Sequence, residues 1–166
     1  MLNYFITTRK AGQGDDLLLF RLFAENKADE FAPLGLSDMQ LKPLLEMQYR
    51  ARGMGYAAAF PNAEQDVVLN SDREPVGHVL VNEDARDLRI IDIAILKEQR
   101  GKGFGTAVLE QIQQRASASG KNLRLQVANG SAAARLYERL GFTAVSSSMV
   151  QTEMEWVCEN AVEEIA

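Results

Sequence analysis

The feature that most limits the fold of this chain is a glycine-rich turn between an apolar run and a helical segment. Residues 90–96 are isoleucine, alanine and leucine apart from one aspartate, and three of residues 100–105 are glycine. Residues 106–112 then have the composition of a helix. A strand, a tight turn and a helix start in this order aim several unpaired backbone N–H groups at one place. Because the helix dipole adds positive potential there, the segment predicts a phosphate site.

The spacing of the glycines narrows the kind of phosphate site. The P-loop string Gly-x-x-x-x-Gly-Lys-Ser/Thr is absent, and the Rossmann string Gly-x-Gly-x-x-Gly fails because Thr106 occupies the third glycine position. The pattern that remains is Arg-x-x-Gly-x-Gly, formed by Arg100, Gly103 and Gly105. Neither glycine has a side chain to keep a pyrophosphate from the backbone, and Arg100 and Lys102 add positive charge.

A second motif lies farther along the chain. Residues 123–127 are strand-like, and a helical segment over residues 132–140 leads into glycine and phenylalanine. With the loop, this order and spacing resembles the GNAT superfamily of N-acetyltransferases over roughly residues 67–142. The positions of this second motif that match the family are Asn129, Leu136, Tyr137, Gly141 and Phe142.

The resemblance implies acetyl-CoA as cosubstrate. Its pyrophosphate would lie on the loop, and the backbone of Ile93, Ala94 and Ile95 would hold the pantetheine arm as if it were a strand. A backbone N–H of this stretch would stabilise the oxyanion formed on attack. Asn129 would bond the arm or a nearby main-chain group, although Asn129-Gly130 is also a good turn dipeptide. The loop residues expected to bind are Arg100, Gly101, Lys102, Gly103, Phe104, Gly105 and Thr106.

The resemblance also suggests two catalytic side chains. Tyr137 would protonate the departing thiolate as general acid, because a phenol keeps its proton at neutral pH and a thiolate is basic enough to take it. The alternative is a core tyrosine packed on the sheet. Asp92 is the candidate general base, and a structural carboxylate is the alternative. His78, the only histidine, sits in a strand-like run where a structural role is favoured over that of a base.

The acceptor is less constrained by the sequence. We expect a primary amine of a small molecule that attacks the thioester directly. A protein or peptide amine is an alternative acceptor, and a non-catalytic acyl-CoA-binding regulatory module is an alternative function. Arg50 or Arg52 could bind an anionic group of the acceptor, although a solvated helix face is favoured. Trp156 is expected in the core.

Composition sets further expectations. The chain has 166 residues with 46% hydrophobic and 25% charged residues, which suits one globular domain. A net charge of −5 argues against a nucleic-acid partner, and no segment suggests a membrane span or a signal peptide. The single Cys158 has no partner in the chain, which favours a reducing cytoplasm. No metal site is indicated, and a homodimer is possible.

The predicted elements give an α+β fold with a mixed, mostly antiparallel sheet flanked by helices. The whole chain, 1–166, would be one domain: 1–65 mainly the acceptor side, 66–145 the acetyl-CoA-binding core, and 146–166 the last strand and an acidic tail, mobile or a short helix. A helix is expected to begin at Ser37 and to end near Arg52, before two glycines. Strands are expected at 4–8, 66–70, 75–81, 88–95, 123–127, 142–145 and 151–157, and further helices near 16–23, 106–118 and 132–140.

Overall fold

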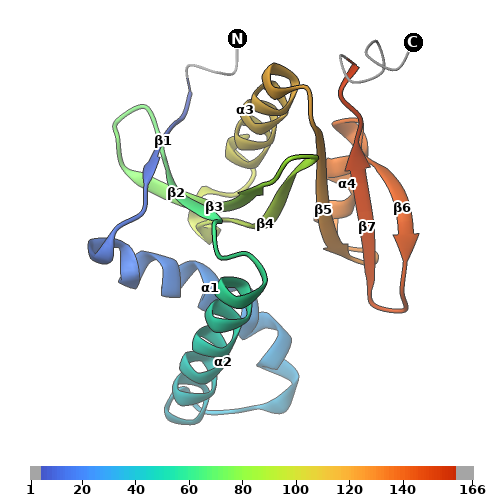
Figure 1. Cartoon of the computed structure of the whole chain (residues 1–166). Helices are drawn as coiled ribbons and strands as arrows, with labels where there is room; N and C mark the ends of the chain where they lie inside the picture. Colours follow the sequence, from blue (N-terminus) through green and yellow to red (C-terminus); the bar gives the residue numbers. More distant parts are fainter. Residues whose placement is uncertain (1–4, 160–166) are drawn as a thin grey trace.

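The computed structural model describes residues 5–159. These residues form one sheet with helices on both faces (Figure 1). The strands are β1 (Thr7–Lys10), β2 (Glu64–Leu69), β3 (Pro75–Glu83), β4 (Asp87–Ile95), β5 (Asn122–Ala128), β6 (Thr143–Ser147) and β7 (Gln151–Trp156). The α-helices are α1 (Asp16–Phe31), α2 (Asp38–Ala59), α3 (Phe104–Ser119) and α4 (Ala132–Arg139), with 3-10 turns η2 (Gln13–Asp15), η3 (Ala32–Leu34) and η4 (Lys97–Gln99).

The sheet is mixed, with the strand order β1-β2-β3-β4-β5-β7-β6. Every neighbouring pair is antiparallel except β4 and β5, which α3 connects as a crossover. Their parallel pairing joins residues 87–90 of β4 to residues 122–125 of β5. Beyond it, β4 continues to Ile95 and β5 to Ala128 without pairing to each other, so the sheet opens between them. The predicted fold class is confirmed.

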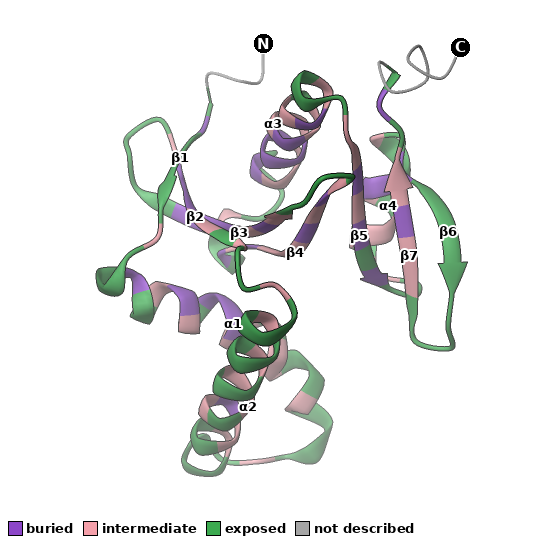
Figure 2. Ribbon diagram, in the orientation of Figure 1, coloured by how far each residue is buried: buried purple, intermediate pink, exposed green. Residues whose placement is uncertain are grey.

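The main core lies between the sheet and the pair α3 and α4. Val108 and Leu109 of α3 pack with Leu88 of β4 and Leu123 of β5, all at most 1% exposed. The buried side of α3 is visible in Figure 2. Half-buried Trp156 packs against the edge of this core, close to the core position expected for it.

A smaller cluster forms on the opposite face, beneath α1 and α2. Leu22 of α1 packs there with Ala94 of β4 and with Leu96, the residue that follows β4. The second helix is mostly exposed (Figure 2), and Leu45 is its one buried residue. Because α2 contributes few side chains to the core, one face of this helix is available to line a cavity over the sheet.

Helix α2 is longer than the sequence predicted. The prediction ended it near Arg52 because Gly53 and Gly55 each weaken a helix by about 1 kcal/mol relative to alanine. In the structure the helix continues through both glycines to Ala59. Residues beyond the glycines form contacts that offset this cost, and one is the hydrogen bond from Arg52 Nε to the Tyr56 hydroxyl, at 2.8 Å.

The first strand also differs from its predicted range. It was expected over residues 4–8, and the structure places it at Thr7–Lys10, where Arg9 and Lys10 lie opposite Val67 and Asp66 of β2. Backbone pairing with β2 sets these bounds, and the apolar pattern on which the prediction relied does not. Residues 1–4 and the acidic tail from residue 160 onward lie outside the described part of the chain.

A β-bulge in β4 determines which face Asp92 occupies. Leu80 of β3 lies opposite Asp92 and Val81 lies opposite Ile90, so Ile91 is the extra residue. Ile90 belongs to the α3-side core, whereas Ala94 packs against α1. Because side chains alternate along a strand, Asp92 shares the face of Ala94, toward α1 and α2. If Ile91 were instead paired in regular alternation, Asp92 would share the face of Ile90.

Gly77 of β3 marks the closest backbone approach to β4. A Cβ added there would lie 2.5 Å from the Ala94 carbonyl oxygen and 2.7 Å from Ile95 Cδ1. We expect Gly77→Ala to lower the free energy of unfolding in urea by about 1–3 kcal/mol, the usual range for overpacking. Gly55→Ala is the control, because its added Cβ meets nothing within 4 Å. That change should stabilise α2 by up to about 1 kcal/mol, and equal destabilisation by both would contradict the close approach.

Candidate active site

The glycine-rich loop lies between η4 and α3. Gly101 and Gly103 have φ of 76° and 89°, a region that favours glycine, and α3 begins at Phe104. The backbone N–H groups of residues 101–106 donate no hydrogen bond to any described residue. This row of free donors at the start of a sixteen-residue helix is what an anionic group requires.

The two basic side chains of the loop have neutral partners. Arg100 donates to the Ile95 carbonyl oxygen at 3.2 Å and to Asn26 Oδ1 at 2.6 Å, which ties the loop to β4 and α1. Lys102 donates to Gln99 Oε1 at 3.2 Å. Neither side chain forms an ion pair with a carboxylate of residues 5–159, although the Lys102 charge contributes to the lowered pKa of Glu98. In this arrangement the Arg100 side chain positions the loop.

The backbone of β4 beyond its pairing with β5 offers hydrogen-bonding groups to the opening in the sheet. The Leu96 N–H donates to Val76 of the β3 side. Since backbone groups alternate in direction along a strand, those of Ala94 also face β3, and those of Ile93 and Ile95 face the opening. Of the three residues predicted to hold the pantetheine arm, this geometry favours Ile93 and Ile95.

Asn129 follows β5 and bonds to the β6–β7 hairpin. Its side-chain amide donates to the Ser148 carbonyl oxygen at 3.0 Å, and its Oδ1 accepts from the Thr152 hydroxyl at 2.6 Å. Its backbone N–H donates to the Val150 carbonyl oxygen. The structure thus shows the second of the two predicted partners, a nearby main-chain group, and the side chain holds the hairpin against the end of β5.

Tyr137 projects from α4 into the main core. Its ring is 5.7 Å from that of Phe142, and the residue is 7% exposed. No described residue forms a hydrogen bond with its hydroxyl. Burial, and then the negative charge of Asp92, raise the pKa of Tyr137 to about 12. The phenol therefore keeps its proton at any ordinary working pH, as a general acid must.

Asp92 lies in the wall of the cavity, and its charge contributes to the raised pKa of Tyr137. Asp92 is bound on both carboxylate oxygens: Oδ1 lies 2.5 Å from an Arg52 guanidinium nitrogen and Oδ2 lies 2.8 Å from His78 Nε2. Burial alone would raise the pKa of Asp92, but the His78 hydrogen bond and the Arg52 charge outweigh burial and lower it. Asp92 is ionised at neutral pH.

His78 is buried between Asp92 and Gln65. A carboxylate can only accept, so His78 Nε2 carries the hydrogen and donates to Asp92. His78 Nδ1 then accepts from Gln65 Nε2, 3.2 Å away. Both ring nitrogens are occupied, which agrees with the structural role favoured from sequence. Gln65, absent from the predicted site, fixes the tautomer of the histidine.

Arg52 is held on several sides. Its guanidinium lies 5.4 Å from the centroid of the Phe23 ring and 5.1 Å from that of Tyr56, in addition to its bonds to Tyr56 and Asp92. Burial alone would lower the pKa of Arg52, but the Asp92 charge and the Tyr56 hydroxyl raise it. The solvated helix face favoured from sequence is therefore wrong for Arg52, which points toward the sheet.

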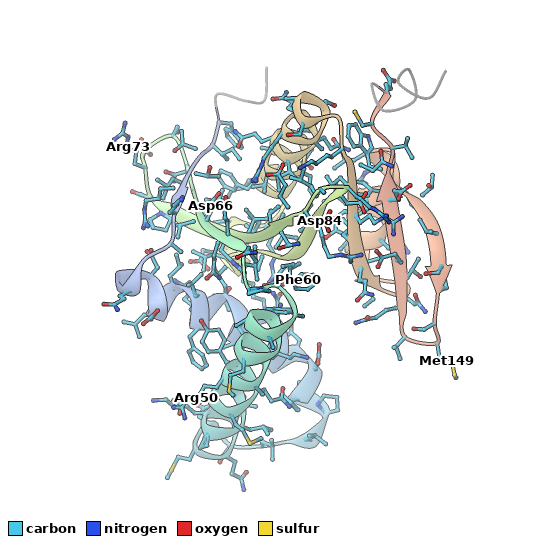
Figure 3. The ribbon with its side chains drawn as sticks, in the orientation of Figure 1. Arg50, Phe60, Asp66, Arg73, Asp84 and Met149 are labelled. Carbon is cyan, nitrogen blue, oxygen red and sulfur yellow. The ribbon has the colours of Figure 1, made fainter. Side chains whose placement is uncertain are left out.

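These groups line a cavity of about 640 Å³ over the α1/α2 face of the sheet. Figure 3 labels Arg50 on α2 and Phe60 at the end of α2, and both belong to its wall. The sequence carried no motif for this wall, since its residues come from five separate segments. The lining side chains from those segments include Leu19, Phe23, Tyr49, Met54, Tyr56, Gln65 and Leu80.

In the described part of the chain, no group of three or more histidine, cysteine, aspartate or glutamate side chains is placed to hold a metal ion. None of the helices in residues 5–159 is long and apolar enough to cross a bilayer.

A family model described as an acetyltransferase (GNAT) domain matches residues 47–158. The match covers more than half of the 166 residues, so the chain belongs to the GNAT acetyltransferase family and is an acetyltransferase. The resemblance seen in the sequence is confirmed. No curated protein sequence matches the chain.

Solved structures agree with this fold. PaiA N-acetyltransferase from Thermoplasma acidophilum, in complex with coenzyme A, has a TM-score of 0.70 at 16% identity and covers 92% of this chain and 98% of its own. Spermidine N-acetyltransferase from Vibrio cholerae, a dodecamer, has a TM-score of 0.64 at 17% identity, covering 97% and 98%. The structure described as histone acetyltransferase HPA2 and related acetyltransferase, from Corynebacterium glutamicum, has a TM-score of 0.62 at 24% identity. It covers 93% of this chain and 97% of its own. At these identities the likeness establishes the fold.

Proposed function

We propose that this protein transfers the acetyl group of acetyl-CoA to a primary amine of a small molecule. The observations that carry the proposal are the row of free N–H groups in the loop, the opening of the sheet between β4 and β5, and a cavity of about 640 Å³ with Asp92 in its wall. Small-molecule sites commonly have volumes of about 300–1,000 Å³. A cavity of this size favours a small amine over a protein acceptor.

The cofactor would enter between β4 and β5. Its pyrophosphate would accept hydrogen bonds from residues 101–106, and its pantetheine arm would pair with the backbone of Ile93 and Ile95. The fold neighbour bound to coenzyme A supports acetyl-CoA as the donor. The free N–H of Ile93 or Ile95 is the candidate donor to the thioester oxygen as it becomes an oxyanion.

In the reaction, the neutral amine nitrogen attacks the thioester carbonyl carbon and forms the new C–N bond. The C–S bond then breaks, the sulfur takes a proton from the Tyr137 hydroxyl, and the phenolate regains a proton from water. Asp92 would accept a hydrogen bond from the amine, since each carboxylate oxygen keeps a lone pair beyond those used by Arg52 and His78. Its lowered pKa makes it a weak base, so the amine proton would pass through Asp92 to water.

The first experiment is calorimetric titration of the full chain with acetyl-CoA, with ATP as control ligand. We expect saturable micromolar binding of acetyl-CoA alone. In the same titration Gly103→Ala should weaken binding at least about tenfold, because a side chain in this positive-φ conformation distorts the donor row.

Gly120→Ala is the matched control, because Gly120 ends α3 with φ of 65° and its added Cβ also meets nothing within 4 Å. Both changes should cost about 1–2 kcal/mol of stability, but only the Gly103 change should reduce affinity. Absence of acetyl-CoA binding by the unchanged protein would refute the proposed function. Equal affinity of the two variants would remove the loop from the binding site.

A further inference from the structure

The charges that line the cavity are unevenly balanced. Among its described lining residues, Asp92 is the one carboxylate, and Arg50 and Arg52 are two cations. The Asp92 charge is already paired with Arg52. Among the described lining residues, an ammonium that enters the cavity therefore meets no unpaired negative charge, and Asp16, a carboxylate beyond the wall, acts on it by raising the pKa of Tyr49. An acceptor with a second ammonium group would bury that group without a counter-ion, beside a guanidinium.

Arg52 cannot readily move away to expose Asp92. Its bonds to Asp92 and Tyr56, and the Phe23 ring within 5.4 Å, hold it from three directions. A rotation outward would leave a largely buried carboxylate with only its His78 bond, and breaking one partner from a buried pair is costly. The positive charge is thus a fixed part of the wall.

The remaining wall is suited to an apolar group. Leu80 of the sheet, Leu19 of α1 and Phe60 at the end of α2 face the cavity with Tyr49 and Met54. Apolar and aromatic surface of this kind gains free energy by burying hydrocarbon and gains nothing from a charged chain. The lining therefore separates two kinds of primary amine: those with a hydrocarbon body and those with several charges.

We infer that the acceptor is an apolar primary amine whose reacting nitrogen is its only cationic group, and that Arg52 is the residue that excludes diamines and polyamines. This inference rests on the proposed acetyl transfer and makes its acceptor class definite. It separates this chain from the spermidine N-acetyltransferase whose fold it shares. The discrimination works by charge: the wall repels the second ammonium and accepts a methyl group in the same place.

Two amines of equal length, n-pentylamine and 1,4-diaminobutane, test the inference. n-Pentylamine ends in a methyl group where 1,4-diaminobutane ends in a second ammonium group. With the full chain and saturating acetyl-CoA, kcat/KM should favour n-pentylamine by at least about 30-fold, because like-charge contacts discriminate strongly. Arg52→Gln should reduce that ratio at least about tenfold. Arg52→Lys retains the charge and should keep most of the preference.

Arg86→Gln is the control, because it removes the same charge from the exposed turn before β4 and should leave the ratio unchanged. Preference for the diamine, acetylation of neither amine by protein that binds acetyl-CoA, or equal loss of the ratio in Arg52→Gln and Arg52→Lys would overturn the inference. The wild-type ratio needs no variant, so a poorly folding Arg52→Gln leaves the test intact. Failure to bind acetyl-CoA would instead refute the proposed function.

Discussion

Replacing Tyr137 with phenylalanine should lower kcat for acetyl transfer by at least about 100-fold, the lower end of what one positioned acid contributes. The phenylalanine ring keeps the packing on Phe142 and loses only the hydroxyl, which has no partner among the described residues. Free energy of unfolding and acetyl-CoA affinity should therefore stay near wild type. Steady-state kinetics with the amine, together with calorimetry for acetyl-CoA, measure the two effects separately.

The pH dependence of the wild-type protein provides a second check on Tyr137. Its pKa of about 12 means that the hydroxyl is lost as an acid only when the pH rises toward that value. Between about pH 7 and 10, the kcat of the wild type should therefore show no fall caused by ionisation of Tyr137. The pH profile of Tyr137→Phe should have the same shape over this range. An unchanged kcat in the variant would leave Tyr137 as a core residue, the alternative raised from its sequence.

Replacing Asp92 with asparagine should lower kcat/KM for the amine by at least about 100-fold while acetyl-CoA still binds. It should also reduce the free energy of unfolding by about 1–3 kcal/mol, because the Arg52 charge loses its partner. This is less than for a fully buried pair, since 30% of the Arg52 side chain is exposed. Kinetics and urea unfolding measure the two losses.

The stability part of this prediction has a definite pH window. The lowered folded-state pKa of Asp92 means that the unfolded state binds its proton more readily. The contribution is therefore complete above about pH 5 and is lost as the pH falls through the folded-state pKa. The difference in unfolding free energy between wild type and Asp92→Asn should shrink in acid, and a constant difference would contradict the pairing.

Asp15→Asn is the matched control for Asp92→Asn. Asp15 accepts two hydrogen bonds of 2.8 Å from Arg9, and these bonds with that of Gly12 lower its pKa to about 2. Its loss should destabilise the protein, yet it lies outside the cavity and should leave kcat/KM unchanged. Similar activity losses in both variants would assign the Asp92 effect to stability alone.

The parts of the molecule predicted from sequence are those whose signals are local. The glycine loop and α3 follow from backbone freedom and apolar spacing within a short segment. The start of α2 also follows from a local signal. The Ser37 hydroxyl accepts a hydrogen bond from the Gln40 N–H, and the Gln40 side-chain oxygen accepts one from the Ser37 N–H. Tyr137 could be selected because its motif, through Gly141 and Phe142, lies in one segment.

The acceptor side was not predictable in the same way. Arg52 contacts Asp92 forty residues farther along the chain, and nothing in either segment specifies that contact. It depends on α2 continuing through two glycines that locally disfavour a helix, and on the backbone pairing of β3 with β4. Gln65 had no sequence signal, because a lone glutamine in a strand is usually only an exposed residue. Sequence therefore indicated the cofactor half and left the acceptor half open.

The bulge at Ile91 means that β4 carries one residue more than its pairing with β3 requires. Deletion of one residue between Leu88 and Asp92 would restore regular pairing, with Asp92 still opposite Leu80 and its carboxylate still on the cavity face. Substitution of the Ile91 side chain would change neither face. When chains of this type are aligned, a one-residue gap before the aspartate is therefore compatible with the same site. A relative with the gap would lack the bulge and keep its aspartate in the cavity.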